Sequence, residues 1–585
     1  METLLFHQPF KMIVVSMTAV SILIAGLLIY RYIYPKKKIN LLVLLLLIST
    51  LPLISILRPG SYQSGDLTLH AKYAMQFFDN IAQGNIIPQW IGNHCSSYGC
   101  PEYIYIFFLP YYLISFFHFI GFSFIDSVKV LLIVSFYTSG IGMYLWMKDE
   151  LGKKAGFVAA IFYLFAPYHL IDLSFRVSIG ELTSLAILPF LFLTTKKLVT
   201  TRKNIFILLT SLSLALLILS HQATALISFP IVILYGIIVW LRKKEKTLHT
   251  VLVTLSSYLL GILLSAFYWI PIFALKNDIW YGAYPKIDFH TFLDTLYSPH
   301  RFGILFQGHM GELYINVGYT EWLVLFFALY LLYKKRVKGN DKKLLLFALG
   351  MFLILFIFTQ SITKPIWNYF SFTESIQFAW RLFLEMSLIV AVVAGVIAKN
   401  VKSNKFIFIL CAITIMYTIL NWGNRQTEPQ LTDAIFRNQP LFQEKPGEVE
   451  LTTPVWVDRY AKWIGIYPKS HMQVLSGSAQ ITPEVRQQTL HTYKISVKKN
   501  AVIKENTFYF PGWELFVNGQ QKPINYLNKK YRGVITFPLK KGTYQIKLLY
   551  VYNSVSVIAQ RLSLFALAIF VILVYNAFLN KARIH

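Results

Sequence analysis

Long apolar runs alternate with short basic loops along most of the chain. Residues 41–57 carry no charge at all, and residues 562–579 are similarly apolar. Each run approaches the roughly 20 residues that a helix needs to cross about 30 Å of hydrocarbon. No aqueous core could absorb so many runs, so the pattern predicts a polytopic α-helical membrane protein. Further runs of this kind lie at residues 205–219, 227–241, 344–359 and 406–419.

The loops between the runs set the predicted path of the chain. Many carry clustered Lys and Arg, as at residues 36–38, 242–244 and 334–336, and such clusters stay on the cytoplasmic side of a membrane. Placing every basic loop inside predicts thirteen spans, with large outer loops at residues 58–128 and 271–320. The predicted spans are residues 12–30, 39–57, 129–147, 155–171, 183–195, 204–220, 226–241, 249–270, 321–333, 343–360, 380–398, 405–421 and 556–579.

Residues 103–120 interrupt this alternation. They are apolar enough to cross, but a crossing would place the KDELGKK stretch at 148–154 outside. Their Tyr, Phe and Pro content suits the membrane–water interface. We therefore expect this segment to lie in the outer interface or to form a re-entrant loop.

The composition changes at residue 422. From there to residue 555 the chain holds turn pairs such as Asn518–Gly519 and strand-like runs such as WELFV and GVITFPL. This pattern predicts a small antiparallel β domain, a sandwich, outside the membrane. Its 18 Lys and Arg against 9 Asp and Glu fit contact with an anionic wall polymer or lipid headgroups, and equally a solvated surface. The expected domains are residues 1–421 in the membrane, 422–555 outside, and 556–585 as the last span with a cytoplasmic tail.

Composition and charge narrow the function classes. Only 14% of the 585 residues are charged, against about 25% in soluble domains. The net charge of +28 is spread over short loops, which argues against nucleic-acid binding. Three cysteines are too few for a disulfide framework. Cys95 and Cys100 lie close together in a predicted outer loop. A disulfide and free thiols are both open alternatives there, and both are favoured over a zinc site with His94.

Ionisable residues gather at the predicted outer helix ends, where they mark candidate functional sites. Asp66 and His70 are four residues apart and share a face if a helix begins after Gly65. Asp66 fits a helix N-cap and a catalytic carboxylate equally well. Asp172 and Arg176 are spaced for an ordinary helix ion pair. The other candidates are His169, Glu181, His221, Gln377 and Arg381.

Several of these candidates have ordinary alternatives. A lone histidine such as His221 is more often a capping or packing residue than a ligand. Arg381, beside Gln377 at the mouth of a predicted span, can simply snorkel, or it can grip a phosphate with its planar fork. The outer loop 271–320 is rich in Asp and His but has no spacing diagnostic of a metal site.

Six segments together carry a family resemblance. They are GDLTLH from residue 65, APYHLIDLSFRVSIGE from 166, LSHQATAL from 219, QFAWRLF from 377, YFPGWELFVNG from 509 and YRGVITFPL from 531. With these motifs the chain resembles the prokaryotic membrane proteins described as 6-pyruvoyl-tetrahydropterin synthase-related. That family is similar to the GT-C glycosyltransferases, which take a sugar from a polyprenyl-phosphate carrier outside the membrane. Nothing in the chain resembles a soluble pterin enzyme.

The resemblance implies a GT-C-like inverting glycosyltransferase of the cell membrane, acting on its outer face. Its donor would be a polyprenyl-phosphate-linked sugar, and its acceptor a polymer, lipid or protein of the cell envelope. By resemblance Asp66 is the catalytic base, and His70 is a second catalytic candidate. No Asp-X-Asp pair lies near Asp66, so no cofactor is expected and a divalent metal has no support. The expected substrate-binding residues are Asp172, Arg176, Glu181, His221, Gln377 and Arg381.

Two other functions are compatible with a polytopic membrane protein of this composition. A transporter or flippase of lipid-linked sugars would place charged residues near mid-membrane, whereas these candidates lie at outer helix ends. A non-catalytic scaffold for envelope assembly would use the β domain as its binding module, and Asp66 would then be dispensable.

Overall fold

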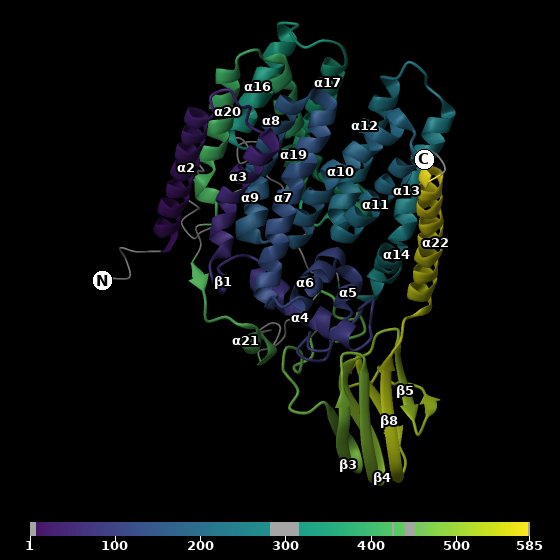
Figure 1. The fold of residues 1–585 in the computed structure, drawn as a ribbon. Helices are drawn as coiled ribbons and strands as arrows, with labels where there is room; N and C mark the ends of the chain where they lie inside the picture. The colour runs from purple at the N-terminus through teal and green to yellow at the C-terminus, as the bar shows by residue number, and fades with distance from the viewer. Residues whose placement is uncertain (1–7, 281–314, 424–425, 439–450, 459, 583–585) are drawn as a thin grey trace, which may run out of the picture.

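A body of long helices carries a β domain at one end (Figure 1). This computed structural model describes residues 8–280, 315–423, 426–438, 451–458 and 460–582. The helices are α2 Gln8–Ile33, α3 Leu41–Leu53, α4 Leu67–Ala82, α5 Glu102–Tyr105, α6 Leu109–Phe119, α7 Phe124–Leu151, α8 Lys153–Leu164, α9 Pro167–Ile171, α10 Ile179–Thr201, α11 Asn204–Ser220, α12 Gln222–Leu241, α13 Leu248–Leu264, α14 Ala266–Leu275, α16 Tyr319–Tyr333, α17 Gly339–Phe358, α18 Lys364–Tyr369, α19 Leu382–Asn400, α20 Asn404–Tyr417, α21 Asp433–Asn438 and α22 Ser554–Ala582.

Six helices of the described chain are long and apolar enough to cross a membrane, or up to nine if each of three bent pairs is one span. Four shorter apolar helices of 10–17 residues accompany them. All thirteen predicted spans fall mainly within these helices and bent pairs, so the helical character of the segments was predicted correctly. The lengths of the described helices support six to nine crossings. Thirteen spans stay a prediction.

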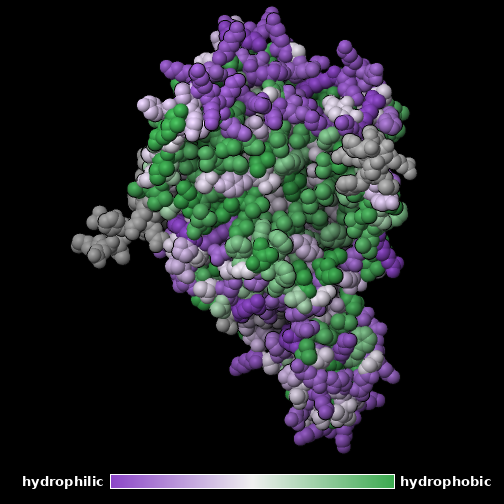
Figure 2. All heavy atoms as spheres, in the orientation of Figure 1, coloured by the Kyte–Doolittle hydropathy of each residue, from purple (hydrophilic) through white to green (hydrophobic). Residues whose placement is uncertain are grey.

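The helical body has a buried core, and its outermost helices expose apolar side chains. Helix α19 is almost completely buried and packs against α8, α16 and α17, while α7 packs against α8 and α10. Helices α2 and α22 instead expose most of their apolar side chains. On the face drawn in Figure 2 this appears as a hydrophobic belt across the body, with hydrophilic side chains beyond it at both ends. Lipid is the solvent in which such a belt is stable.

The segment 103–120 lies at the end of the body nearest the β domain (Figure 1). It forms the short helices α5 and α6, and α6 packs against α4 and α7. The eleven residues of α6 fall well short of the roughly 20 needed to cross a bilayer. That the segment does not span the membrane stays a prediction.

The β domain is antiparallel, as predicted, but its strands form one hydrogen-bonded network rather than two separate sheets. The long strand β4 pairs with β3 on one side; on the other it pairs with β8 through Leu490–Val497 and with β7 from Ala501 onward. The predicted turn Asn518–Gly519 joins β5 to β6 with both residues at positive φ, as a tight hairpin requires. The strands are β3 Met472–Arg486, β4 Leu490–Phe508, β5 Trp513–Val517, β6 Gln520–Lys522, β7 Val534–Leu539 and β8 Gly542–Tyr550.

Side chains of the first outer loop fasten the β domain to the helical body. Gln488, between β3 and β4, donates to Oε1 of Gln76 at 2.5 Å and accepts from the backbone of Gly92 at 2.6 Å. Trp90 packs edge-on against Trp513 at 5.4 Å between ring centroids. The loop that carries the predicted site is therefore held between the helices and the β domain.

Candidate functional site

The loop before α4 is anchored to a π-helical turn, η2, at Asp172–Arg176. Gly65 donates to the carbonyl of Phe175 at 2.7 Å, and Asp66 donates to the carbonyl of Arg176 at 2.9 Å. A Cβ at Gly65 would lie 3.0 Å from that carbonyl oxygen, so the close approach favours glycine. Isolated π-helical turns are frequent at functional sites. This anchoring brings Asp66 beside residues more than a hundred positions away in the sequence.

Asp66 occupies the N-cap position of α4, but its side chain makes no capping hydrogen bond. Ser64 caps the helix instead, because its Oγ accepts from the backbone of Leu67 at 3.1 Å. Partial burial raises the pKa of the Asp66 carboxyl; the Arg176 charge opposes this rise and the Glu181 charge adds to it. Asp66 is thus a carboxylate that the helix does not use for capping, placed near an arginine.

A buried ion network lies next to Asp66. The fully buried Glu181 carboxylate accepts from both terminal nitrogens of Arg176 at 3.1 Å and from the Tyr168 hydroxyl at 2.5 Å. Arg176 also pairs with Oδ1 of Asp172 at 2.6 Å, while Oδ2 of Asp172 is buried without a hydrogen bond in the described chain. The predicted Asp172–Arg176 ion pair is therefore present as part of a larger network.

Arg381, which lies 200 positions after Glu181 in the sequence, also joins this network. Its Nε lies 3.2 Å from Oε1 of Glu181, and one terminal nitrogen donates to the carbonyl of Ile376 at 2.7 Å. Its guanidinium stands 5.4 Å from the ring centroid of Phe378. Between them Gln377 adopts a left-handed backbone with φ 64°. Glu181 thus lies between two guanidinium groups, and Arg381 connects it to the segment 376–378.

The three candidate histidines do not join the network by hydrogen bonds. His70 is buried in α4 and bonds through Nδ1 to the Tyr111 hydroxyl at 2.9 Å. Burial lowers the pKa of His70 to about 3, so the ring is neutral at physiological pH. His221 caps α12, since its Nδ1 accepts from the backbone of Thr224 at 3.2 Å. His169 is buried elsewhere, with Nδ1 2.9 Å from the carbonyl of Tyr163.

A large cavity shares the 376–378 segment with the network. Its volume is about 850 Å³. Gln377 lines it, and of the eight predicted site residues it alone is found among the lining residues of the described chain. The walls come from α5, α11, α12, α13, α14, the segment Lys276–Trp280 and residues 451–455 before the β domain.

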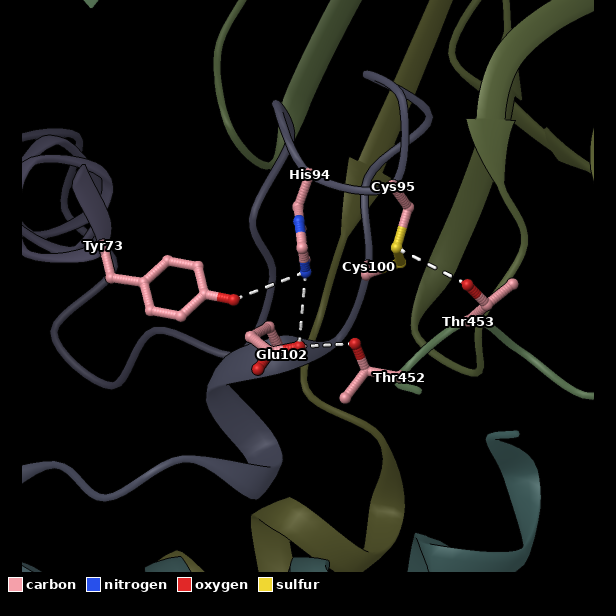
Figure 3. Close-up of a disulfide and its surroundings, with 7 residues drawn as sticks. All are labelled: Tyr73, His94, Cys95, Cys100, Glu102, Thr452 and Thr453. Atoms are coloured by element: carbon pink, nitrogen blue, oxygen red, sulfur yellow. Dashed lines mark hydrogen bonds and ion pairs between the residues drawn. A yellow bond between two sulfur atoms is a disulfide. The ribbon is translucent and has the colours of Figure 1, made fainter. Parts of the chain in front are cut away.

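One lining residue, Glu102, was not predicted as part of the site. Its side chain is 17% exposed and lies 3.5 Å from Nε2 of His94, and it accepts a hydrogen bond from the Thr452 hydroxyl. Figure 3 shows these groups beside the disulfide between Cys95 and Cys100. The disulfide settles the open question about these cysteines, and a disulfide removes their thiolates as zinc ligands.

No group of three or more His, Cys, Asp or Glu side chains is arranged to hold a metal ion within the residues that the structure describes. Most of the predicted outer loop 271–320 lies outside those residues, since the description stops at Trp280 and resumes at residue 315. The described part of the site therefore consists of the Asp66 carboxylate, the ion network and the cavity.

The chain matches a known protein family and is distantly similar to several solved structures. The family model described as "6-pyruvoyl-tetrahydropterin synthase related domain; membrane protein" matches residues 105–424, more than half of the chain. An uncharacterized protein of Lactococcus lactis is 24% identical over 255 residues, which are 42% of each chain.

Three solved structures, of an arabinofuranosyltransferase and of oligosaccharyltransferases, are similar to this chain at TM-scores near 0.4. The mycobacterial arabinofuranosyltransferase AftD is 15% identical with a TM-score of 0.41, over 66% of this chain and 27% of that one. The oligosaccharyltransferase of Archaeoglobus fulgidus is 13% identical with a TM-score of 0.39, over 66% and 56%. The archaeal oligosaccharyltransferase AglB of the same organism, in complex with an inhibitory peptide and a dolichol-phosphate, is 12% identical at 0.39, over 73% and 63%. The chain covers less than two thirds of each of these proteins.

Proposed function

This chain belongs to the 6-pyruvoyl-tetrahydropterin synthase-related family of membrane proteins, and from that premise we propose that it is a membrane glycosyltransferase of the GT-C type. It transfers a sugar from a polyprenyl-phosphate carrier to a hydroxyl group of a cell-envelope acceptor, on the outer face of the membrane. The observation that carries this proposal is the Asp66 carboxylate, which is not used for capping and lies beside the Arg176–Glu181–Arg381 network.

The proposed reaction uses Asp66 as general base. Its carboxylate removes the proton from the acceptor hydroxyl while that oxygen bonds to the anomeric carbon of the donor sugar. The bond from the anomeric carbon to the phosphate oxygen breaks with inversion, and the electron pair leaves with the lipid phosphate. The raised pKa of Asp66 makes it a stronger base than an ordinary surface aspartate.

The arginines suit the leaving phosphate. Glu181 balances part of the charge of Arg176 and Arg381 and fixes the direction of both forks. An arginine whose fork is already oriented loses less freedom when it binds a phosphate oxygen. Preorganised donors of this kind stabilise the charge that develops on the leaving group. Arg381 is the better candidate because its guanidinium lies 5.4 Å from the ring centroid of Phe378, a residue that lines the cavity.

The cavity suits an amphipathic donor. Faces of α11, α12, α13 and α14 give it apolar walls, while polar side chains come from α5, Gln222, the segments 276–280 and 375–378, and Thr452. A polyprenyl chain gains free energy from the apolar part at about 25 cal/mol per Å² buried. Its phosphate then lies at the polar part, where Lys276 and Gln377 line the cavity. The apolar lining residues are Leu214, Ile218, Ala225, Leu226, Phe229, Ile262, Ile272 and Phe273.

The test is transfer of radiolabel from a set of polyprenyl-phosphate sugars into envelope material, using membranes that contain the full-length protein. Arg381→Ala should weaken donor use at least tenfold, and Arg381→Lys should recover only part because it lacks the bidentate fork. Glu514→Gln, a change in β5 at a residue that is not among the described lining residues of the cavity, is the matched control and should transfer like wild type. If wild type transfers no sugar of the set, the scaffold hypothesis replaces this proposal.

A further inference from the structure

The end of the cavity nearest the β domain has a chemistry that a lipid tail and a phosphate do not need. An acid, Glu102, lines it next to Thr452 of the segment that leads into the β domain. The amides of Gln222 and Asn277 line the same cavity. The large rings of Trp269 and Trp280 line the same cavity. A carboxylate opposes phosphate binding by charge repulsion, so this end calls for a different part of the ligand.

Glu102 is held in place and kept ionised by its neighbours. Burial alone would raise the pKa of its carboxyl, but hydrogen bonds and charge from His94, with further bonds from Thr452 and Tyr73, bring the pKa below the ordinary value. An ionised carboxylate only accepts hydrogen bonds. The group it selects must therefore bring its own donors, as a hydroxyl does.

The turn that presents His94 is unusual and is closed by the disulfide. Cys95, Ser96 and Ser97 have φ values of 51°, 55° and 65°, a left-handed backbone that residues with a Cβ adopt at a cost. Gly99 N–H closes the turn on the His94 carbonyl at 2.9 Å. The disulfide between Cys95 and Cys100 holds this conformation, and Figure 3 shows His94 reaching from it toward Glu102.

A second segment of the chain, residues 451–456, connects the surroundings of Glu102 to the β domain. Trp280 donates to the Thr453 carbonyl at 2.9 Å, and Val455 donates to the Asp278 carbonyl at 3.0 Å. The next residue, Trp456, donates through its indole to the Tyr509 carbonyl at 2.6 Å. The segment 451–456 therefore closes this end of the cavity and fixes Thr452 against Glu102.

We propose that this end of the cavity is a subsite for the neutral sugar of the lipid-linked donor, with Glu102 as the residue that recognises sugar hydroxyls. The ring faces of the tryptophans suit the apolar faces of a hexose, and the amides suit its remaining hydroxyls. The disulfide and His94 act on the sugar only by positioning Glu102. This inference rests on the proposed function, because it takes the cavity as the donor site.

The test compares two lipids on the purified full-length protein in nanodiscs: polyprenyl-phosphate hexoses, and the same polyprenyl phosphate without sugar. Wild type should bind at least one hexose lipid about tenfold or more tighter than the bare carrier. Glu102→Gln should remove roughly 10- to 100-fold of that affinity, the equivalent of one charged hydrogen bond, and leave the bare carrier within twofold. Glu514→Gln should change neither.

A second pair of measurements covers the case in which Glu102→Gln does not fold. Wild type treated with a reductant, and the Cys95→Ser, Cys100→Ser double variant left untreated, should both lose the preference for the hexose lipid while still binding the bare carrier. Equal losses for both lipids in the Glu102 or cysteine variants, or no loss for either, would refute the subsite but leave the proposed function standing. If wild type binds neither lipid, the proposed function fails and the subsite falls with it.

Discussion

Replacing Glu181 by Gln should destabilise the helical body strongly. The Glu181 carboxylate is fully buried and accepts from Arg176 at 3.1 Å, Arg381 at 3.2 Å and Tyr168 at 2.5 Å. Gln has almost the same shape, but it removes the charge between two guanidinium groups and turns an amide donor toward one of them. Breaking a buried ion pair from one side costs about 3–5 kcal/mol.

The melting temperature in detergent measures this loss. An unfolding entropy of about 2.1 cal/mol/K per residue gives roughly 0.8 kcal/mol/K for a body of about 400 residues, so a loss of about 4 kcal/mol lowers Tm by about 5 °C. Spanning helices keep much of their backbone structure in lipid, which makes the entropy smaller and the shift larger.

Asp66→Asn is the matched control, since this carboxylate makes no hydrogen bond or ion pair with another described residue. It should change stability by no more than about 0.5 kcal/mol, which is less than about 1 °C. The reasoning is wrong if Glu181→Gln melts within 1 °C of wild type, or if Asp66→Asn falls as far as Glu181→Gln.

Three further predictions follow from other parts of the molecule. Transfer should slow as pH falls, because the base must be ionised, and the midpoint should lie above the ordinary Asp value of 3.8 since the pKa of Asp66 is raised; a rate that is flat or rises toward acid pH contradicts this. Glu505→Gln should destabilise the β domain by about 3–5 kcal/mol. Charges of Arg486 and His491 outweigh burial and hold the pKa of Glu505 below 4.5, so this stabilisation is complete above pH 4.5 and lost at lower pH; urea titrations of wild type and variant should converge in acid. Single cysteines at Ser64 and Asn518 should react with an impermeant thiol reagent in intact cells and one at Lys335 should not, whereas labelling of Lys335 alone would reverse the topology.

Local patterns in the sequence predicted the helices and the strands. Apolar runs and basic loops lie within single elements, so they can be recognised without knowing what packs against them. The turn Asn518–Gly519 was recognisable for the same reason, since its backbone preference is a property of the two residues. The pairing of Asp172 with Arg176 is likewise a matter of four-residue spacing on one turn.

The parts of the site that depend on long-range packing were not predictable in this way. Glu181 and Arg381 were each candidates, but their contact joins residues 200 positions apart. The role of Asp66 was open between capping and catalysis, and only the geometry shows that the Ser64 hydroxyl caps α4 instead. Glu102 was missed because nothing in its own segment indicates a cavity. The proximity of His94 and two cysteines was the one available hint.

The central claim is that Asp66 is the base of a glycosyl transfer, and Asp66→Asn tests it most directly. The measurement is radiolabel transferred from a polyprenyl-phosphate sugar by membranes that contain equal amounts of folded wild-type or variant protein. Asn keeps the size of the side chain but accepts no proton at neutral pH, so the rate should fall roughly a hundredfold or more. Transfer by the variant at close to the wild-type rate would contradict the claim.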